Sequence, residues 1–167
     1  MIQTKKFLLP LLILALAGTS LAQSLDGAKF YKLDFVVREV EGGKPVNSRM
    51  FSAILQVQTP QREVGTATIR AGGRVPFTSG SGTQFFDLGV NIDAKDLRET
   101  QSDVSVTIST DISSIGQDNP GNPPVVRQNR WSSTVMAPIK KPTVVFASDD
   151  MTSKRQLQLE LTATPIK

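Results

Sequence analysis

The chain has 167 residues, with 19 lysines and arginines against 15 aspartates and glutamates, and it contains neither histidine nor cysteine. Without these two residue types, Ser-His and Cys-His nucleophile pairs, disulfide bonds and the usual zinc sites are excluded. The formal charge is +4, of which Lys5 and Lys6 contribute two, and the other basic residues are scattered. Because a nucleic-acid surface needs a dense basic stripe, usually with aromatic residues, we expect no nucleic-acid partner.

The first 22 residues have the pattern of a secretory signal peptide. Two lysines precede the apolar stretch Phe7–Ala17, and Ser20-Leu21-Ala22 supplies the small residues that a signal peptidase recognises. We expect cleavage after Ala22 and export to the periplasm or to an outer-membrane-associated location. An uncleaved membrane anchor is the alternative, although the apolar run is about half the roughly 20 residues that span a bilayer and contains Pro10. No cysteine follows, so attachment as a lipoprotein is excluded.

Residues 23–167 have the length of one domain, and alternation of apolar and polar residues with period two dominates them. Alternate apolar residues in Tyr31–Val37 and in Phe51–Val57 predict two strands, each with one buried face. The segment Glu41–Pro45 between them contains the glycines and proline of a chain reversal. A β-hairpin over Tyr31–Gln58 is therefore expected.

The middle of the chain continues the strand pattern in shorter pieces. Ala67–Ala71 predicts a strand that ends at Gly72-Gly73, and the small polar residues of Thr78–Gly82 predict a flexible loop. Alternation resumes over Phe86–Ile92, which predicts another strand. We expect the following segment, Lys95–Asp103, to be a polar linker with at most one helical turn.

The last third of the sequence predicts further strands at Val104–Ile112, Trp131–Ala137, Val144–Phe146 and Leu157–Ala163. Gly116–Pro124 has no apolar side chain and is expected to be an exposed loop. About eight strands and no convincing helix beyond the signal peptide predict an all-β fold. We expect one antiparallel β-domain over residues 23–167, packed as a sandwich or curled sheet, with a barrel as a further possibility.

Carboxylates are the remaining candidates for chemistry. Asp149-Asp150 has the composition of a hard-cation or acid-base site, but a charged turn between two strands explains it better. Asp87 and Asp93 share one strand face and lie about 20 Å apart, too far for a carboxylate pair. We therefore expect no catalytic, cofactor or metal site, and we do not expect an enzyme.

Aromatic residues and one loop provide candidates for an interface. Phe85 and Phe86 point to opposite faces of a strand, so one of them is expected to be exposed, and Phe85 is the candidate. Trp131 shares strand parity with core positions, which favours packing in the core over stacking on a ligand. The other interface candidates are basic residues after the long loop and amides within it: Arg127, Arg130, Asn119 and Asn122.

Five segments in order resemble motifs of the secretins, the ring-forming outer-membrane channels of bacterial secretion and pilus systems. Ile69–Phe77 resembles the "G-x-x-V-P" strand of that family, and Phe86–Ile92 resembles its "Y-x-D-x-G-x-x-L" strand. Val104–Ser114 is similar to the next strand, which ends in a serine. The last two likenesses are Pro124–Arg130 with Ser133-Thr134-Val135, to "P-x-[I/V]-x-x-R-x-x-x-T-x-V", and Leu157–Lys167, to "L-x-[I/V]-x-x-T-P-x-[I/V]".

The likeness covers residues 64–167 and stops short of a gated channel. Thr143-Val144-Val145 is not followed by the family's "I-G-G-L" and gate segment, and the Tyr31–Gln58 hairpin stands where ring-building domains are found. The resemblance implies a trimmed secretin-like β-core that acts through a protein partner or as a homo-oligomer in the cell envelope, as an accessory to a secretion or pilus system. A gateless ring inserted in the outer membrane is the alternative. Short apolar faces and sparse aromatics favour a soluble core.

Overall fold

The computed structural model describes residues 27–60, 65–79, 82–115, 125–150 and 153–166. Within them the chain forms eight strands and no helix, which confirms the predicted all-β antiparallel fold. The described residues thus contain no helix that is long and apolar enough to cross a membrane. The strands are β1 (Phe30–Glu41), β2 (Lys44–Gln56), β3 (Ala67–Ser79), β4 (Gly82–Glu99), β5 (Asp103–Ile115), β6 (Val126–Pro138), β7 (Thr143–Asp149) and β8 (Arg155–Ile166).

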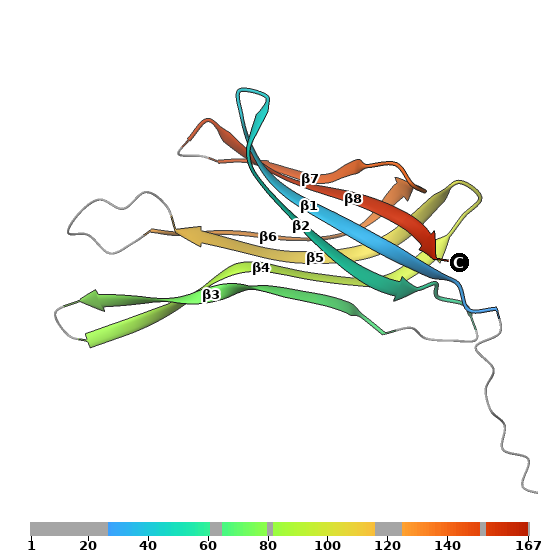
Figure 1. Ribbon diagram of the computed structural model, residues 1–167, viewed down its shortest axis with the longest axis horizontal. Helices are drawn as coiled ribbons and strands as arrows, with labels where there is room; N and C mark the ends of the chain where they lie inside the picture. The colour runs from blue at the N-terminus through green and yellow to red at the C-terminus, as the bar shows by residue number, and fades with distance from the viewer. Residues whose placement is uncertain (1–26, 61–64, 80–81, 116–124, 151–152, 167) are drawn as a thin grey trace, which may run out of the picture.

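The strands form two four-stranded sheets, with orders β2-β1-β8-β7 and β3-β4-β5-β6 (Figure 1). Every pairing is antiparallel, and β1 pairs with β8 along its whole length, from Phe30 opposite Ile166 to Glu41 opposite Arg155. The first and last described strands therefore lie side by side in the middle of one sheet. The second sheet is a simple meander of consecutive strands.

The hydrophobic core lies between the two sheets, and the central strands supply most of it. On β5, every second residue from Val104 to Ile112 is buried, including the polar Thr110. On β1, Leu33 and Phe35 are fully buried, and on β8, Leu159 and Leu161 are too. Period-two alternation thus places one face of each central strand in the core, as predicted, because successive side chains point to opposite faces.

Two corrections concern the middle of the chain. Gly72-Gly73 do not end a strand, because β3 continues through them to Ser79. The predicted linker Lys95–Asp103 is mostly strand, since β4 runs on to Glu99 with a register shift between Lys95 and Arg98, and only residues 100–102 connect it to β5. Asp96 has a φ of 56° at this bulge, and Leu97 is fully buried beside it. The irregular backbone turns an apolar side chain inward within a polar stretch.

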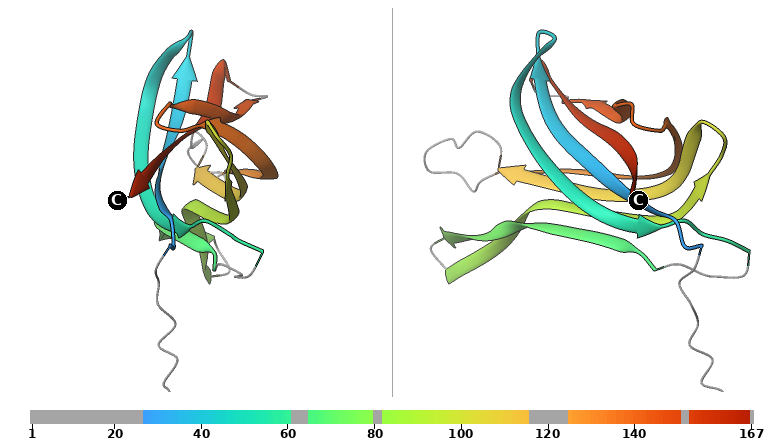
Figure 2. Two further views of the ribbon diagram at one scale, coloured as in Figure 1. Left: turned by 90° about the vertical axis from the view of Figure 1, so that its right-hand side faces the viewer. Right: turned by 45° about the vertical axis from the view of Figure 1, so that its right-hand side comes forward.

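The β3–β4 hairpin extends beyond the core, away from the end of the β1–β2 hairpin (Figures 1 and 2). Gly72 faces Gly89 where it leaves the core. A Cβ atom on Gly72 would lie 2.1 Å from the carbonyl oxygen of Leu88, and Gly89 has a φ of 150°. Two facing glycines therefore permit a close backbone approach at this crossing.

The predicted Tyr31–Gln58 hairpin is confirmed as β1 and β2, which pair from Phe30 opposite Gln56 to Glu41 opposite Lys44. Three predictions fall wholly or partly outside the described residues. They are the signal peptide of residues 1–22, the loop Gly116–Pro124, and the tip of the predicted loop Thr78–Gly82, of which residues 80–81 are not described.

Candidate functional site

The candidate site is formed by strands at the margins of the two sheets, which have a hydrogen-bonded neighbour strand on one side only. β2, β3 and β6 each have 13 residues and lie at the margin of a sheet, and β7 forms the fourth margin with seven residues. β2 lies near β3 on one flank of the sandwich, and β6 lies near β7 on the other. A marginal strand has backbone N–H and C=O groups that can pair with another chain.

The outward face of β2 presents an apolar row. Met50 is 65% exposed and Ile54 is 62% exposed, and Val46, four residues earlier, is also exposed. Between them on the same face lie Ser48 and Ser52, because the inward face of this strand is set by the buried Leu55. Charged residues and proline discourage pairing at an edge; β2 has them at Lys44, Pro45 and Arg49, but not in this row. We call Val46, Ser48, Met50, Ser52 and Ile54 the β2 row.

The middle of the outward face of the other sheet, along β5 and β6, is polar, and its side chains are linked to one another. The exposed Val126 and Met136 lie toward the two ends of β6 on the same face. Across β5 and β6 the hydroxyl oxygens of Thr107 and Thr134 lie 2.9 Å apart, and those of Ser109 and Ser132 lie 2.7 Å apart. Asp111 continues this line of cross-strand pairs toward the β5–β6 tip. These pairs bind strand to strand within the sheet and leave it a hydrophilic surface.

Two carboxylates on this polar face are held in their charged form. The side-chain amide of Gln128 donates to Asp111 at 2.8 Å and Arg130 donates at 2.9 Å, which together hold the pKa of Asp111 below its usual value. Arg70 donates to both oxygens of Asp93, at 2.9 and 2.8 Å, and lowers the pKa of that carboxyl. Hydrogen bonds to a carboxylate favour its ionised form.

The predicted interface residues do not come together into one patch. Arg127 donates to Asp150 at 2.6 Å, which ties β6 to the chain after β7, and Arg130 is bound to Asp111 on the opposite face of β6. Asn119 and Asn122 lie outside the described residues. An interface role for these residues stays a prediction.

Phe85 lies in the protruding part of the β3–β4 hairpin. It is 56% exposed, whereas Phe86 is partly buried with its ring 6.4 Å from that of Phe77, so the expected difference between the two neighbours is confirmed. The Arg74 guanidinium lies 5.5 Å from the centre of the Phe85 ring and donates to Asp87 at 3.0 Å. The hairpin therefore presents an aromatic ring with a cation stacked on it.

Trp131 packs against the core and is partly buried, with its ring 5.2 Å from that of Phe146, as the sequence predicted. Asp149 is the last residue of β7 and Asp150 follows it toward β8, where the sequence predicted a charged turn between two strands. Asp149 accepts a hydrogen bond from Gln156, and Asp150 accepts them from Arg127 and Ser153. No group of three or more acidic residues that could hold a metal ion occurs in the described part of the chain.

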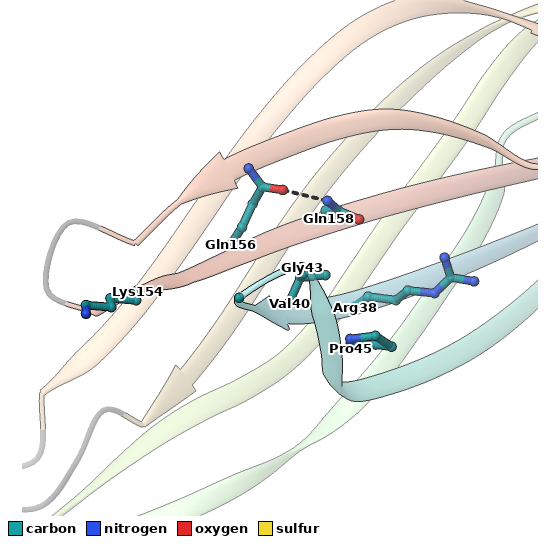
Figure 3. A pocket seen from close by; sticks show the side chains of 8 residues that line it. Arg38, Val40, Gly43, Pro45, Lys154, Gln156 and Gln158 are labelled. Carbon is teal, nitrogen blue, oxygen red and sulfur yellow. Dashed lines mark hydrogen bonds between the residues drawn. The ribbon is translucent and has the colours of Figure 1, made fainter.

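Two of the hollows on the surface of the described residues bear on the site predictions, and neither of these two gathers side chains into one reactive group. The first, of about 400 Å³, lies between the β1–β2 turn and the start of β8 and is lined by Arg38, Val40, Gly42, Gly43, Pro45, Lys154, Gln156 and Gln158. Arg38 and Lys154 lie at opposite ends of it (Figure 3). Arg38 is engaged with both oxygens of Glu160, at 2.8 and 3.1 Å. The hollow thus presents two separated cations and two amides.

The second hollow, of about 370 Å³, lies at the glycine crossing of β3 and β4. It is lined by Arg70 and Arg74, whose guanidinium groups already bind Asp93 and Asp87. Ser113 also lines it and accepts a hydrogen bond from the Gly89 N–H at 3.0 Å. Its polar groups are engaged in holding the strands together.

The β2 row was missed by sequence analysis. The alternation over Phe51–Val57 identified the inward face of this strand correctly, and the apolar residues on the other parity were passed over. Met50 and Ile54 lie on the outward face of β2. Apolar residues at both even and odd positions are typical of a strand with apolar residues on both faces. That pattern was the available evidence for an exposed apolar row.

No known family profile matches the chain, and no curated protein does. Solved structures that it resembles include the type II secretion secretin XcpQ from Pseudomonas aeruginosa, with 13% identity and a TM-score of 0.43. The secretin InvG of the Salmonella type III injectisome matches with 7% identity and a TM-score of 0.49. The secretin GspD of Escherichia coli K12 matches with 11% identity and a TM-score of 0.44.

These matches cover 83%, 84% and 84% of this chain, but it spans only 57%, 62% and 48% of the three secretin chains. These solved structures are secretins, the family whose motifs the sequence also resembles. Identities this low concern the fold alone.

Proposed function

We propose that this protein is an exported, non-enzymatic β-domain that works by protein–protein assembly in the cell envelope, using its open strand edges. The observation that carries the proposal is the presence of three 13-residue strands at sheet margins, one with an exposed apolar row. Addition of a strand at such an edge is a common mode of protein recognition, because the backbone supplies the affinity and alternate side chains supply specificity.

The regular backbone register of these edges supports pairing with another polypeptide. Nothing in β6 interrupts its 13 consecutive pairs with β5, so its free margin is equally regular. β2 has one register shift, between Glu39 and Val40 of its partner strand, and is regular from there to Gln56. A margin with a regular register is the form that a new strand can extend.

The chemistry of the described surface supports a role without catalysis. The first hollow contains no carboxylate, and the second contains one, Asp87, which is bound to Arg74. The sequence supplies neither the histidine nor the cysteine on which most general-base and nucleophile arrangements depend. The proposed action is therefore binding.

The signal-peptide pattern of residues 1–22 and the ordered secretin-like motifs over residues 64–167 support an envelope location. They also support a role as an accessory to a secretion or pilus system.

Site-specific photocrosslinking in living cells tests this proposal. A photoreactive amino acid replaces Ile54 on β2, Arg74 on β3 or Met136 on β6, and the controls carry it at Ser109 or Thr162, in the middle of the two sheets. The proposal predicts crosslinked adducts in the envelope fraction from the edge positions and none from the central ones. Equal labelling at both kinds of position, or no adduct at any edge, would contradict it.

A gateless ring in the outer membrane is the second candidate, and one observation favours it. The sheet β3-β4-β5-β6 is bounded by two strands of equal length, so the β6 edge of one copy matches the β3 edge of the next. Head-to-tail contacts of this kind form a ring when the rotation from one copy to the next closes the circle. Fractionation distinguishes the two, since a ring of this kind is released only by detergent and a soluble assembly is released without it.

A further inference from the structure

The β2 row reads the same in both directions. Its outward residues are apolar, serine, apolar, serine, apolar: Val46, Ser48, Met50, Ser52 and Ile54. The three apolar members are exposed, and Met50 lies at the centre of the row. A row with this symmetry, on a strand at a sheet margin, is complementary to a second copy of itself running antiparallel.

One register satisfies the whole row. With Met50 of one copy opposite Met50 of the other, Val46 faces the partner's Ile54 and Ser48 faces the partner's Ser52. Each outward position then meets a side chain of its own kind across the strand pair, which is the arrangement that stabilises antiparallel pairing. Shifting the register by four residues leaves one apolar residue of each copy without an apolar counterpart.

The inward face of β2 accepts the same register. Arg49 and Phe51 are inward residues on either side of Met50, so Arg49 of each copy lies opposite the partner's Phe51. A guanidinium beside an aromatic ring is a favourable pair, and no two cations directly oppose each other. Arg49 is exposed and Phe51 is partly buried, which leaves room for both contacts.

Space beside this part of β2 is also open. The strand forms one margin of its sheet, and its first half extends with the β1–β2 hairpin away from the other sheet (Figures 1 and 2). Residues 44–50 are all exposed. The two-fold axis at Met50 would therefore pass through the middle of β2, at the inner end of this exposed stretch.

We propose that two copies of this protein pair through β2 about a two-fold axis at Met50, forming one continuous eight-stranded sheet, β7-β8-β1-β2 followed by its symmetry mate. The inference rests on the proposed function, which is assembly through open strand edges. It adds which edge is used and which partner binds there. The partner is a second copy, and the contact is self-complementary.

Disulfide trapping tests the axis, because the chain has no cysteine of its own. Residues directly opposite in an antiparallel pair have Cα atoms about 4.5–5.5 Å apart, within disulfide range. The Met50→Cys variant of the whole chain is expressed and recovered from the envelope fraction without detergent. It is then oxidised with glutathione disulfide. We expect a covalent dimer. Met136→Cys, at a methionine of matching exposure on β6 (63%), is the control and is expected to stay monomeric.

The register is tested with two further single variants. Val46→Cys alone cannot reach its own symmetry mate, because the two sites lie about 27 Å apart along the strands. The same holds for Ile54→Cys. Mixing the two variants places one cysteine opposite the other, so the mixture is expected to form a covalent heterodimer that neither variant forms alone. Crosslinking of Val46→Cys with itself as efficiently as in the mixture would overturn the register.

A charge at the axis tests the same contact without crosslinking. In Met50→Lys two ammonium groups face each other across the two-fold axis, so the dissociation constant of the dimer is expected to rise at least tenfold, measured by sedimentation velocity. Met136→Lys is expected to change it less than twofold, and circular dichroism confirms that both variants fold. A wild-type protein that shows no dimer, or an unchanged constant in Met50→Lys, would overturn the inference.

The outcomes separate this inference from the proposed function. Photocrosslinks from β3 or β6 to another protein, with no disulfide dimer from Met50→Cys, overturn the β2 pairing and leave assembly through edges standing. Absence of both overturns the two together.

Discussion

Replacing Gly89 by alanine perturbs the crossing of β3 and β4 at its tightest point. The new Cβ would lie 2.2 Å from the carbonyl oxygen of Ala71 and 2.5 Å from the Cα of Gly72. Ordinary contacts of a Cβ atom begin near 3.4 Å, so the two strands must separate locally by about 1 Å. The φ of 150° at Gly89 adds strain, because side-chain-bearing residues rarely adopt it.

The two effects set the expected magnitude. Overpacking costs about 1–3 kcal/mol and an unfavourable backbone conformation about 1–3 kcal/mol, so we expect Gly89→Ala to lower the free energy of unfolding by about 2–6 kcal/mol. For a domain of this size, that corresponds to a fall in Tm of about 4–24 °C. Urea unfolding followed by circular dichroism measures it.

Gly73→Ala is the matched control, one residue beyond the crossing on β3. A Cβ atom there meets nothing within 4 Å, and Gly73 does not have a positive φ. We expect a change within about 0.5 kcal/mol. If the two variants unfold at the same urea concentration, the close approach does not constrain the hairpin and the reasoning is refuted.

Three further predictions concern the bulge, the β6 margin and the polar face. Leu97→Ala removes a fully buried side chain and is expected to cost about 2–5 kcal/mol in urea unfolding, against less than about 0.5 kcal/mol for Arg98→Ala; equal losses would show that the bulge does not bury Leu97. A double-mutant cycle of Arg127→Ala and Asp150→Asn is expected to give a coupling of about 0.5–1 kcal/mol that weakens in high salt; a salt-independent coupling would contradict an ion pair. Because the pKa of Asp111 is lowered in the folded state, its contribution is present at neutral pH and is lost as the pH falls through the folded-state pKa, so Asp111→Asn is expected to flatten the acid limb of a stability-against-pH curve; an unchanged limb would rule this group out as a cause.

The strands with one buried face were predictable because local alternation determines which side chains enter the core. The inward residues of β5 show this most clearly, since their neighbours on the other parity are almost all polar. Pairing of β1 with β8 was not predictable, because the two strands are adjacent in space and separated by most of the chain, and no local pattern records such contacts.

The errors have a common physical cause. Gly72 and Gly73 were interpreted by their usual effect in a strand, which is to end it, yet facing glycines also permit a close crossing that lets the strand continue. Leu97 lies among polar residues, and only the positive φ of Asp96 turns it inward. The β2 row was missed because the inward parity of that strand accounted for its pattern, and its outward parity gained significance only when β2 proved to be a sheet margin.

The native mass of the protein tests the central claim, assembly through open edges, most directly. The whole chain is expressed, the envelope fraction is extracted without detergent, and the protein is measured by light scattering over a hundredfold range of concentration. Assembly through these edges predicts a mass above that of one chain that increases with concentration, or a stable complex with another protein. A single chain at every concentration, with nothing bound to it, would contradict the account.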